Sequence, residues 1–261
     1  MAHAQSAAIG VAPTRVVIAP NQNTSEIAVI NNSDRLMRYK IEMADQMMTT
    51  SGTLQTISQT ISDTATFPYS AKNMVKFLPR TVNMPAGKRQ TVRLLVTRPQ
   101  GLPAGDYHTH LILTEIVDPV SATEVSITTP LKENAANFQV GMSYSMGIPL
   151  VVQQGTISSS ISIVSASKTV NAQDKSPELT VTLQRSGNAE ASGQLTTTIN
   201  AAGKSIPATQ NRIIRIYREA DQVTIHLPIL EEAVKAATTQ PITLKLESTA
   251  RKQTLQTLQI P

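Results

Sequence analysis

Short stretches in which apolar and polar residues alternate dominate this sequence. Leu179, Val181 and Leu183, for example, alternate with Thr180 and Thr182. Because successive side chains of a β-strand point to opposite faces of the sheet, this period of two indicates half-buried strands. The same period occurs in segments 26–30, 39–43, 91–94, 213–217, 223–227 and 242–246.

Turn-forming residues separate these segments, which is typical of β-sandwiches of the immunoglobulin type. They lie at 21–23, 31–34, 85–87, 102–105 and 186–188. We therefore predict an all-β chain of two immunoglobulin-like β-sandwich domains. The alternation breaks after Val152 and resumes at Ile157, so the predicted domains are residues 1–152 and 153–261. Segment 47–73 is expected to be a long loop or an irregular strand pair, and segment 231–237 a helix of one or two turns.

Composition narrows the functional classes. Cysteine is absent, which excludes a thiol nucleophile, a disulfide and a thiolate metal site. The 23 Lys and Arg residues exceed the 18 Asp and Glu residues, so the net charge is +5, but the basic residues are scattered along the chain. Aromatic residues make up only 3% of the sequence. Nucleic-acid binding is therefore not expected. No apolar run approaches the roughly 20 residues of a membrane-spanning helix. The cores must be built from Val, Ile, Leu, Met and Ala.

The first residues suggest export. Ala2, His3 and Ala4 form a small-x-small pattern of the kind that signal peptidase cleaves, which we interpret as the remnant of a signal peptide behind a start Met. An ordinary N-terminus is the alternative. The expected location is the periplasm.

No set of catalytic residues emerges, so an enzyme is not expected. The sequence has no phosphate-binding glycine loop and no nucleophile elbow. His108 and His110 would share one face of a strand, but zinc needs three or four ligands, so half-exposed strand histidines without metal are expected. Glu115 and Asp118 are expected to be solvated at a strand end.

Segment 138–149 is unusual because large apolar residues fill one face over its whole length. The opposite face carries small or polar residues, among them Gly141, Ser143 and Gly147. The segment is either a long central strand of its own core or an edge strand whose apolar face a partner completes by β-strand addition. The apolar face consists of Phe138, Val140, Met142, Tyr144, Met146 and Ile148.

Four stretches, taken in order, resemble the periplasmic chaperones of the chaperone–usher pathway. They are 14–18 followed by 27–32, then 78–94, then 102–107 running to 115–116, and finally the alternating segment 138–149. Arg-Gln-Thr-Val-Arg at 89–93 and Gly-Ile-Pro-Leu-Val-Val at 147–152 are more similar to the archaic branch of this family.

The resemblance implies two immunoglobulin-like domains arranged as an L with a cleft between them. It implies a chaperone that binds pilus subunits through a donor strand, anchors the subunit's C-terminal carboxylate with basic residues, and delivers the subunit to an outer-membrane usher. It implies no cofactor and no ATP.

The resemblance leaves the carboxylate anchor open. Arg15 matches the family's first anchor, but the second falls at about Pro149, and no Lys or Arg lies in 134–167. Arg89 and Arg93 are the expected substitutes, because residues four apart on a strand share a face and a guanidinium can bind a carboxylate through two hydrogen bonds.

The main alternative is a structural or adhesive immunoglobulin-like surface module. Such a module would use the same strands but would not expose a long apolar edge strand, because exposed edges promote aggregation.

Overall fold

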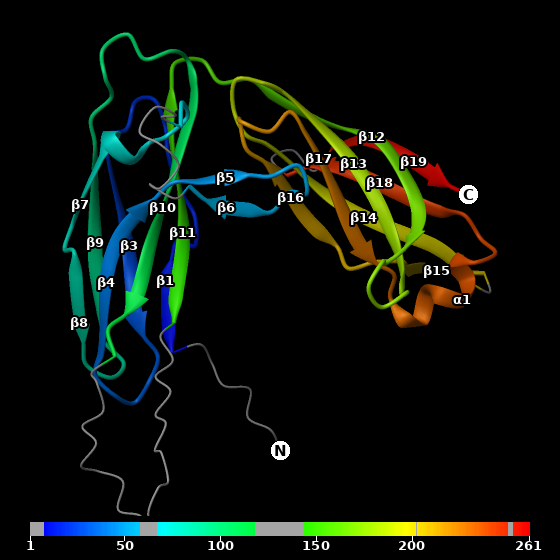
Figure 1. Cartoon of the computed structure of the whole chain (residues 1–261), viewed down its shortest axis with the longest axis horizontal. Coiled ribbons are helices and arrows are strands. Elements are labelled where there is room, and N and C mark those ends of the chain that lie inside the picture. The colour runs from blue at the N-terminus through cyan, green and yellow to red at the C-terminus, as the bar shows by residue number, and fades with distance from the viewer. Residues whose placement is uncertain (1–7, 58–66, 118–143, 202, 250–252) are drawn as a thin grey trace, which may run out of the picture. The chain divides into compact units, whose positions relative to one another are not determined.

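The computed structural model describes residues 8–57, 67–117, 144–201, 203–249 and 253–261. The chain divides into two compact units (Figure 1). The first contains 8–44, 72–97, 109–117 and 144–151, and the second contains the other described residues. Segments 45–57, 67–71 and 98–108 thus pack in the second unit although they precede residue 152.

The first unit is built from two sheets. Their strand orders are the A-B-E-D and A-G-F-C-D of an immunoglobulin-type sandwich, if the letters A and D each cover two consecutive short strands that lie in different sheets. The first sheet has the order β1 (Ile9–Ala12), β3 (Thr24–Asn31), β9 (Arg89–Val96) and β7 (Val75–Leu78). The second has the order β2 (Val16–Ile18), β11 (Ser145–Gln154), β10 (Gly105–Glu115), β4 (Met37–Ala44) and β8 (Thr81–Met84). A short 3-10 helix, η1, spans Lys72–Met74.

The second unit also contains two sheets. One has the order β12 (Ser159–Val170), β13 (Pro177–Gly187) and β17 (Gln222–Pro228). The other has the order β15 (Lys204–Pro207), β14 (Ala191–Ala201), β18 (Ile242–Ser248) and β19 (Thr254–Ile260), with β16 (Arg212–Ile216) also pairing with β14. The hairpin of β5 (Gln46–Met48) and β6 (Leu54–Thr56) belongs to this unit.

The predicted all-β class is confirmed. The predicted strand pair in 47–73 corresponds to β5 and β6, and the predicted short helix is η2 (Glu231–Ala233) followed by α1 (Val234–Ala237). Among the described residues, no helix is long and apolar enough to cross a membrane.

Aliphatic side chains and methionines fill both cores, as composition predicted. The period of two is visible in the burial of the strands: in β9, Val92, Leu94 and Val96 are buried, whereas Arg93 and Leu95 between them are exposed. The largest fully buried side chains include Ile18, Ile27, Met37, Ile41, Met84, Leu111, Leu113, Ile148, Leu150, Leu179 and Leu183.

Candidate functional site

Strand β11 contains the described part of the predicted donor segment, and its outer edge is only partly covered. It lies between β10 and β2. On the β10 side the pairing extends to Tyr144, whose carbonyl accepts a hydrogen bond from the backbone N–H of Glu115 (2.9 Å). On the other side β2 has three residues against the ten of β11. Among the described strands, most of this edge therefore has no partner.

The apolar face of β11 changes from buried to exposed along the strand. Ile148 is 1% exposed and belongs to the core of the first unit, Met146 is half-buried, and Tyr144 is 65% exposed. The other predicted donor residues, Phe138, Val140 and Met142, lie outside the described residues. The described face thus combines both interpretations of the segment, with a core half from Ile148 onward and an exposed half before it.

The exposed half of this face borders an opening into the first unit. Tyr144 and Met146 line a cavity of about 510 Å³ together with the buried residues Tyr39, Leu113 and Glu115. Large apolar side chains therefore surround the start of β11 without filling the space beneath it.

Glu115 is buried in this cavity, so the predicted solvation at a strand end is wrong for this residue. Its carboxylate pairs with the Arg35 guanidinium at 2.9 Å, which offsets the loss of water. Burial, followed by the nearby charge of Glu115, raises the pKa of Tyr39. Asp118 lies outside the described residues.

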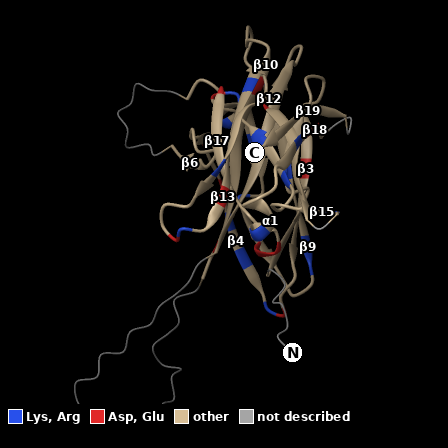
Figure 2. Cartoon of the chain, turned by 90° about the vertical axis from the view of Figure 1, so that its right-hand side faces the viewer, with Lys and Arg blue, Asp and Glu red and all other residues tan. Residues whose placement is uncertain are grey.

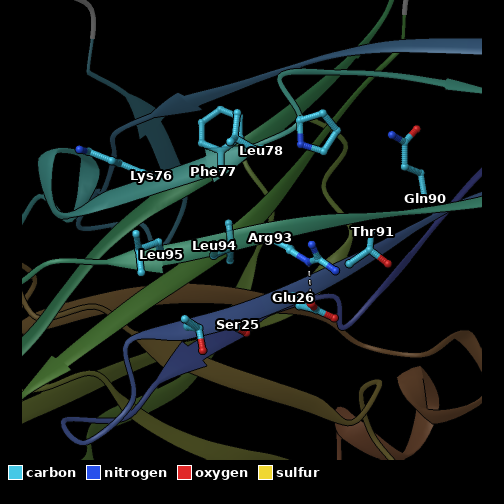
Figure 3. A pocket seen from close by; sticks show the side chains of 12 residues that line it. Ser25, Glu26, Lys76, Phe77, Leu78, Gln90, Thr91, Arg93, Leu94 and Leu95 are labelled. Carbon is cyan, nitrogen blue, oxygen red and sulfur yellow. Dashed lines mark hydrogen bonds and ion pairs between the residues drawn. The ribbon is translucent and has the colours of Figure 1, made fainter.

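The candidate anchors Arg89 and Arg93 lie on the outer face of β9, as their spacing predicted. Both are exposed. The Arg93 guanidinium pairs with Glu26 on the neighbouring strand β3, with Nε 3.1 Å from Oε1 (Figure 3). Arg93 and Glu26 line a surface groove of about 1040 Å³ that also exposes Leu78 and Leu95. An incoming carboxylate would compete with Glu26 for Arg93.

Arg15, the third candidate anchor, is half-buried and immediately precedes β2 in the other sheet. Pro149 is half-buried within β11. The structure thus brings Arg89 and Arg93 to one face and puts Arg15 beside the strand that flanks β11. Elsewhere Lys and Arg are scattered among the strands (Figure 2).

His108 and His110 are buried, with exposures of 1% and 2%, so the prediction of half-exposed histidines is wrong. Strand β10 has a neighbour on both sides, and the ring of Tyr217 stacks on that of His108 at 4.2 Å. Among the described residues, no three histidine, aspartate or glutamate side chains lie together in a way that could hold a metal ion.

Glu219 has a buried carboxylate that connects distant segments of the second unit, and the sequence analysis did not identify it. One carboxylate oxygen lies 3.0 Å from His108 Nε2, and the other accepts the backbone N–H of Met48 at 2.8 Å. Its side chain is 8% exposed. These partners are 111 and 171 residues away in sequence, so no local motif could have identified the contact.

The Glu219 contacts predict how the stability of the second unit depends on pH. Burial raises the pKa of Glu219, but the hydrogen bond from His108, the charge of His108 and the N–H of Met48 together lower the pKa below its ordinary value of 4.5. A group with a lowered pKa in the folded state stabilises the fold above its unfolded pKa, and this contribution is lost as pH falls through the folded pKa.

We therefore expect the free energy of unfolding to fall as pH drops below about 4.5, the ordinary value of this carboxyl group. Urea unfolding at a series of pH values should show a shallower decline for Glu219→Gln than for the unmodified chain. Equal slopes for the two proteins would contradict this assignment.

No family model and no curated protein matches the chain. Among solved structures it is similar to the YadV chaperone, with 11% identity over 97% of this chain and 99% of that chain and a TM-score of 0.49. It is similar to the class 5 fimbriae chaperone CfaA, with 13% identity over 97% and 99% and a TM-score of 0.47. It is also similar to the CsuC–CsuE chaperone–tip adhesion subunit pre-assembly complex from archaic Csu pili of Acinetobacter baumannii, with 14% identity over 97% of each chain and a TM-score of 0.47. Identities this low give no information on individual side chains.

Proposed function

We propose that this chain is a periplasmic chaperone that captures pilus subunits by donor-strand complementation and delivers them to an outer-membrane usher for pilus assembly. One observation carries the proposal: the apolar face of β11 continues past the point where its own core ends, from buried Ile148 to Tyr144 at 65% exposure. The role requires neither a cofactor nor a catalytic group.

The physics of strand addition supports this role. A sandwich that lacks one strand gains backbone hydrogen bonds from a strand donated by a partner, and alternate side chains of the donated strand fill the groove of the incomplete sandwich. Strand β11 offers both, because its edge is uncovered by β2 over most of its length and half-buried Met146 lies two residues from exposed Tyr144 on the same face. In the proposal the domain formed by residues 1–152 lends the strand, with Phe138, Val140 and Met142 extending the same face.

The proposal includes an anchor for the C-terminal carboxylate of the subunit. Arg89 is the leading candidate because it is exposed at the start of β9 and has the planar donor geometry that suits a carboxylate. Arg93 must first release Glu26, and Arg15 is half-buried. The proposed order of importance is therefore Arg89, then Arg15, then Arg93.

Removing the anchor should weaken capture without unfolding the chaperone. A hydrogen bond to a charged group contributes about 1.5–3 kcal/mol, so Arg89→Ala should lower the affinity for a subunit about 10- to 100-fold. Co-expression in the periplasm with a candidate subunit, followed by purification of a one-to-one complex, measures the yield. Arg15→Ala and Arg93→Ala are compared in the same way.

Arg212→Ala is the matched control, because it removes an exposed arginine from β16 in the second unit. The anchor assignment is wrong if Arg89, Arg15 and Arg93 can each be replaced without loss of complex while the proteins stay folded. Failure of the unmodified chain to form a complex with any subunit would instead favour a structural or adhesive module.

A further inference from the structure

The hairpin of β5 and β6, residues 46–56, is held in the second unit by a small number of contacts. Of its strand residues, Met48 is buried and all three residues of β6 are exposed. Its tip is ordered internally, because the hydroxyl groups of Thr49, Ser51 and Thr53 lie within 2.8–3.1 Å of one another. A segment with so little buried surface can open while the rest of the unit stays folded.

The tip of this hairpin contacts the outer edge of β17. The backbone N–H of Thr224 donates to the carbonyl of Thr50 at 2.8 Å. Gly52 has a φ of +72° and lies so close to β17 that a Cβ there would be 3.2 Å from Ile225 Cγ2. Glycine at this position therefore allows both the turn and the close approach.

Next to its tip the hairpin is held by Glu219, which accepts the backbone N–H of Met48, the last residue of β5. The loop that carries Glu219 is itself held by Arg185, whose guanidinium donates to the carbonyls of Arg218 and Ala220. Glu219 thus extends from a loop that is held by hydrogen bonds, and its side chain connects this loop to the hairpin.

Strand β17 is an edge strand of its sheet, with β13 on one side. The backbone N–H and C=O groups of successive residues in an antiparallel strand point to opposite sides, so residues two apart point to the same side. Since the N–H of Thr224 points outward to Thr50, the backbone groups of Gln222 and His226 point outward too. The hairpin tip therefore occupies the middle of an edge that could otherwise pair with another strand.

We propose that this hairpin reversibly covers the β17 edge and that Glu219 holds it in place. When the hairpin detaches, β17 pairs with β17 of a second copy of the chain. A strand that pairs antiparallel with its own copy satisfies two-fold symmetry. The sequence of β17, Gln-Val-Thr-Ile-His-Leu-Pro, has no Lys, Asp or Glu to repel such a copy, although charged residues commonly protect edge strands. This device is independent of subunit capture.

Hydrogen exchange of the full chain, measured by mass spectrometry, tests whether Glu219 holds the hairpin in place. Glu219→Ala should make the amides of 46–56 exchange at least about 10-fold faster, with β12 and β13 unchanged. Asp221→Asn is the control, since it removes a charge from the same loop but keeps an acceptor for Arg185. Gly52→Val, which pushes the tip away from β17 without altering Glu219, should reproduce the effect. The proposal is overturned if both Glu219→Ala and Gly52→Val leave exchange unchanged.

Light scattering over a dilution series measures the oligomeric state and so tests whether β17 pairs with a second copy of the chain. Glu219→Ala should form a dimer that the unmodified chain does not form at the same concentration. Adding Thr224→Pro should abolish the dimer while the fast exchange of 46–56 remains, because proline removes the outward N–H without affecting the bonds to β13. A Glu219→Ala protein that stays monomeric, or a dimer that survives Thr224→Pro, would refute pairing through this edge.

Discussion

Tyr144→Asp is expected to reduce capture of a pilus subunit at least about 100-fold, which corresponds to about 2.8 kcal/mol. In the proposed complex this side chain enters the apolar groove of the subunit, where a carboxylate would have no partner. In the free chain it is 65% exposed, so the aspartate remains hydrated and the melting temperature should change little.

Substitutions at neighbouring residues serve as controls, because they separate the effect of altering the donor face from the effect of adding a charge. Ser145→Asp puts the same charge one residue away on the opposite, exposed face, and capture should be largely retained. Ile148→Ala, in the core of the chain itself, should lower the free energy of unfolding by about 2–5 kcal/mol. Met142→Asp is expected to act like Tyr144→Asp.

Complex yield and the dissociation constant of a purified pair measure capture, and thermal unfolding measures the free chain. Equal losses of capture for Tyr144→Asp and Ser145→Asp would mean that charge alone, and not a donor face, explains the result. Capture by Tyr144→Asp at the unmodified level would remove the described half of the donor face from the proposal.

Arg185→Met is expected to destabilise the second unit strongly. The guanidinium is 4% exposed and donates to four backbone carbonyls and to Asp221. Methionine fills a similar volume but donates nothing. The carbonyls of Ala189 and Ala220 would then be buried without these donors, at about 1–3 kcal/mol each, or about 2–6 kcal/mol together.

Arg215→Met is the matched control for this change. Arg215 lies in the same unit, its side chain is 42% exposed, and its 3.7 Å contact with Glu190 is too long for a hydrogen bond, so this pair should contribute at most about 1 kcal/mol. Denaturant unfolding followed by circular dichroism compares the two variants. Similar losses for both would show that the buried hydrogen bonds of Arg185 contribute little.

The strands were predictable because each carries its own period of two. Arg89 and Arg93 share an outer face for the same local reason. The transition from Ile148 to Tyr144 was not predictable, because the same apolar alternation continues through it and the end of the core depends on distant strands. The period of two shows which side chains share a face but does not show what covers that face.

The histidines illustrate the same limit. His108 is buried because Tyr217 and Glu219 pack against it from more than 100 residues away, and no neighbour in sequence reveals this. The position of the 46–56 hairpin depends likewise on Glu219 and β17. Contacts of this kind require the assembled sheets, so sequence analysis could identify a strand pair but not its site of attachment.

The aliphatic cores have a spectroscopic consequence. With no tryptophan in the chain, excitation in the indole absorption band produces almost no emission from this protein, whether folded or unfolded. Any indole fluorescence in a mixture therefore originates from the binding partner. The folding of a tryptophan-containing subunit can thus be followed optically while it is bound, without labelling either protein and without subtracting a background.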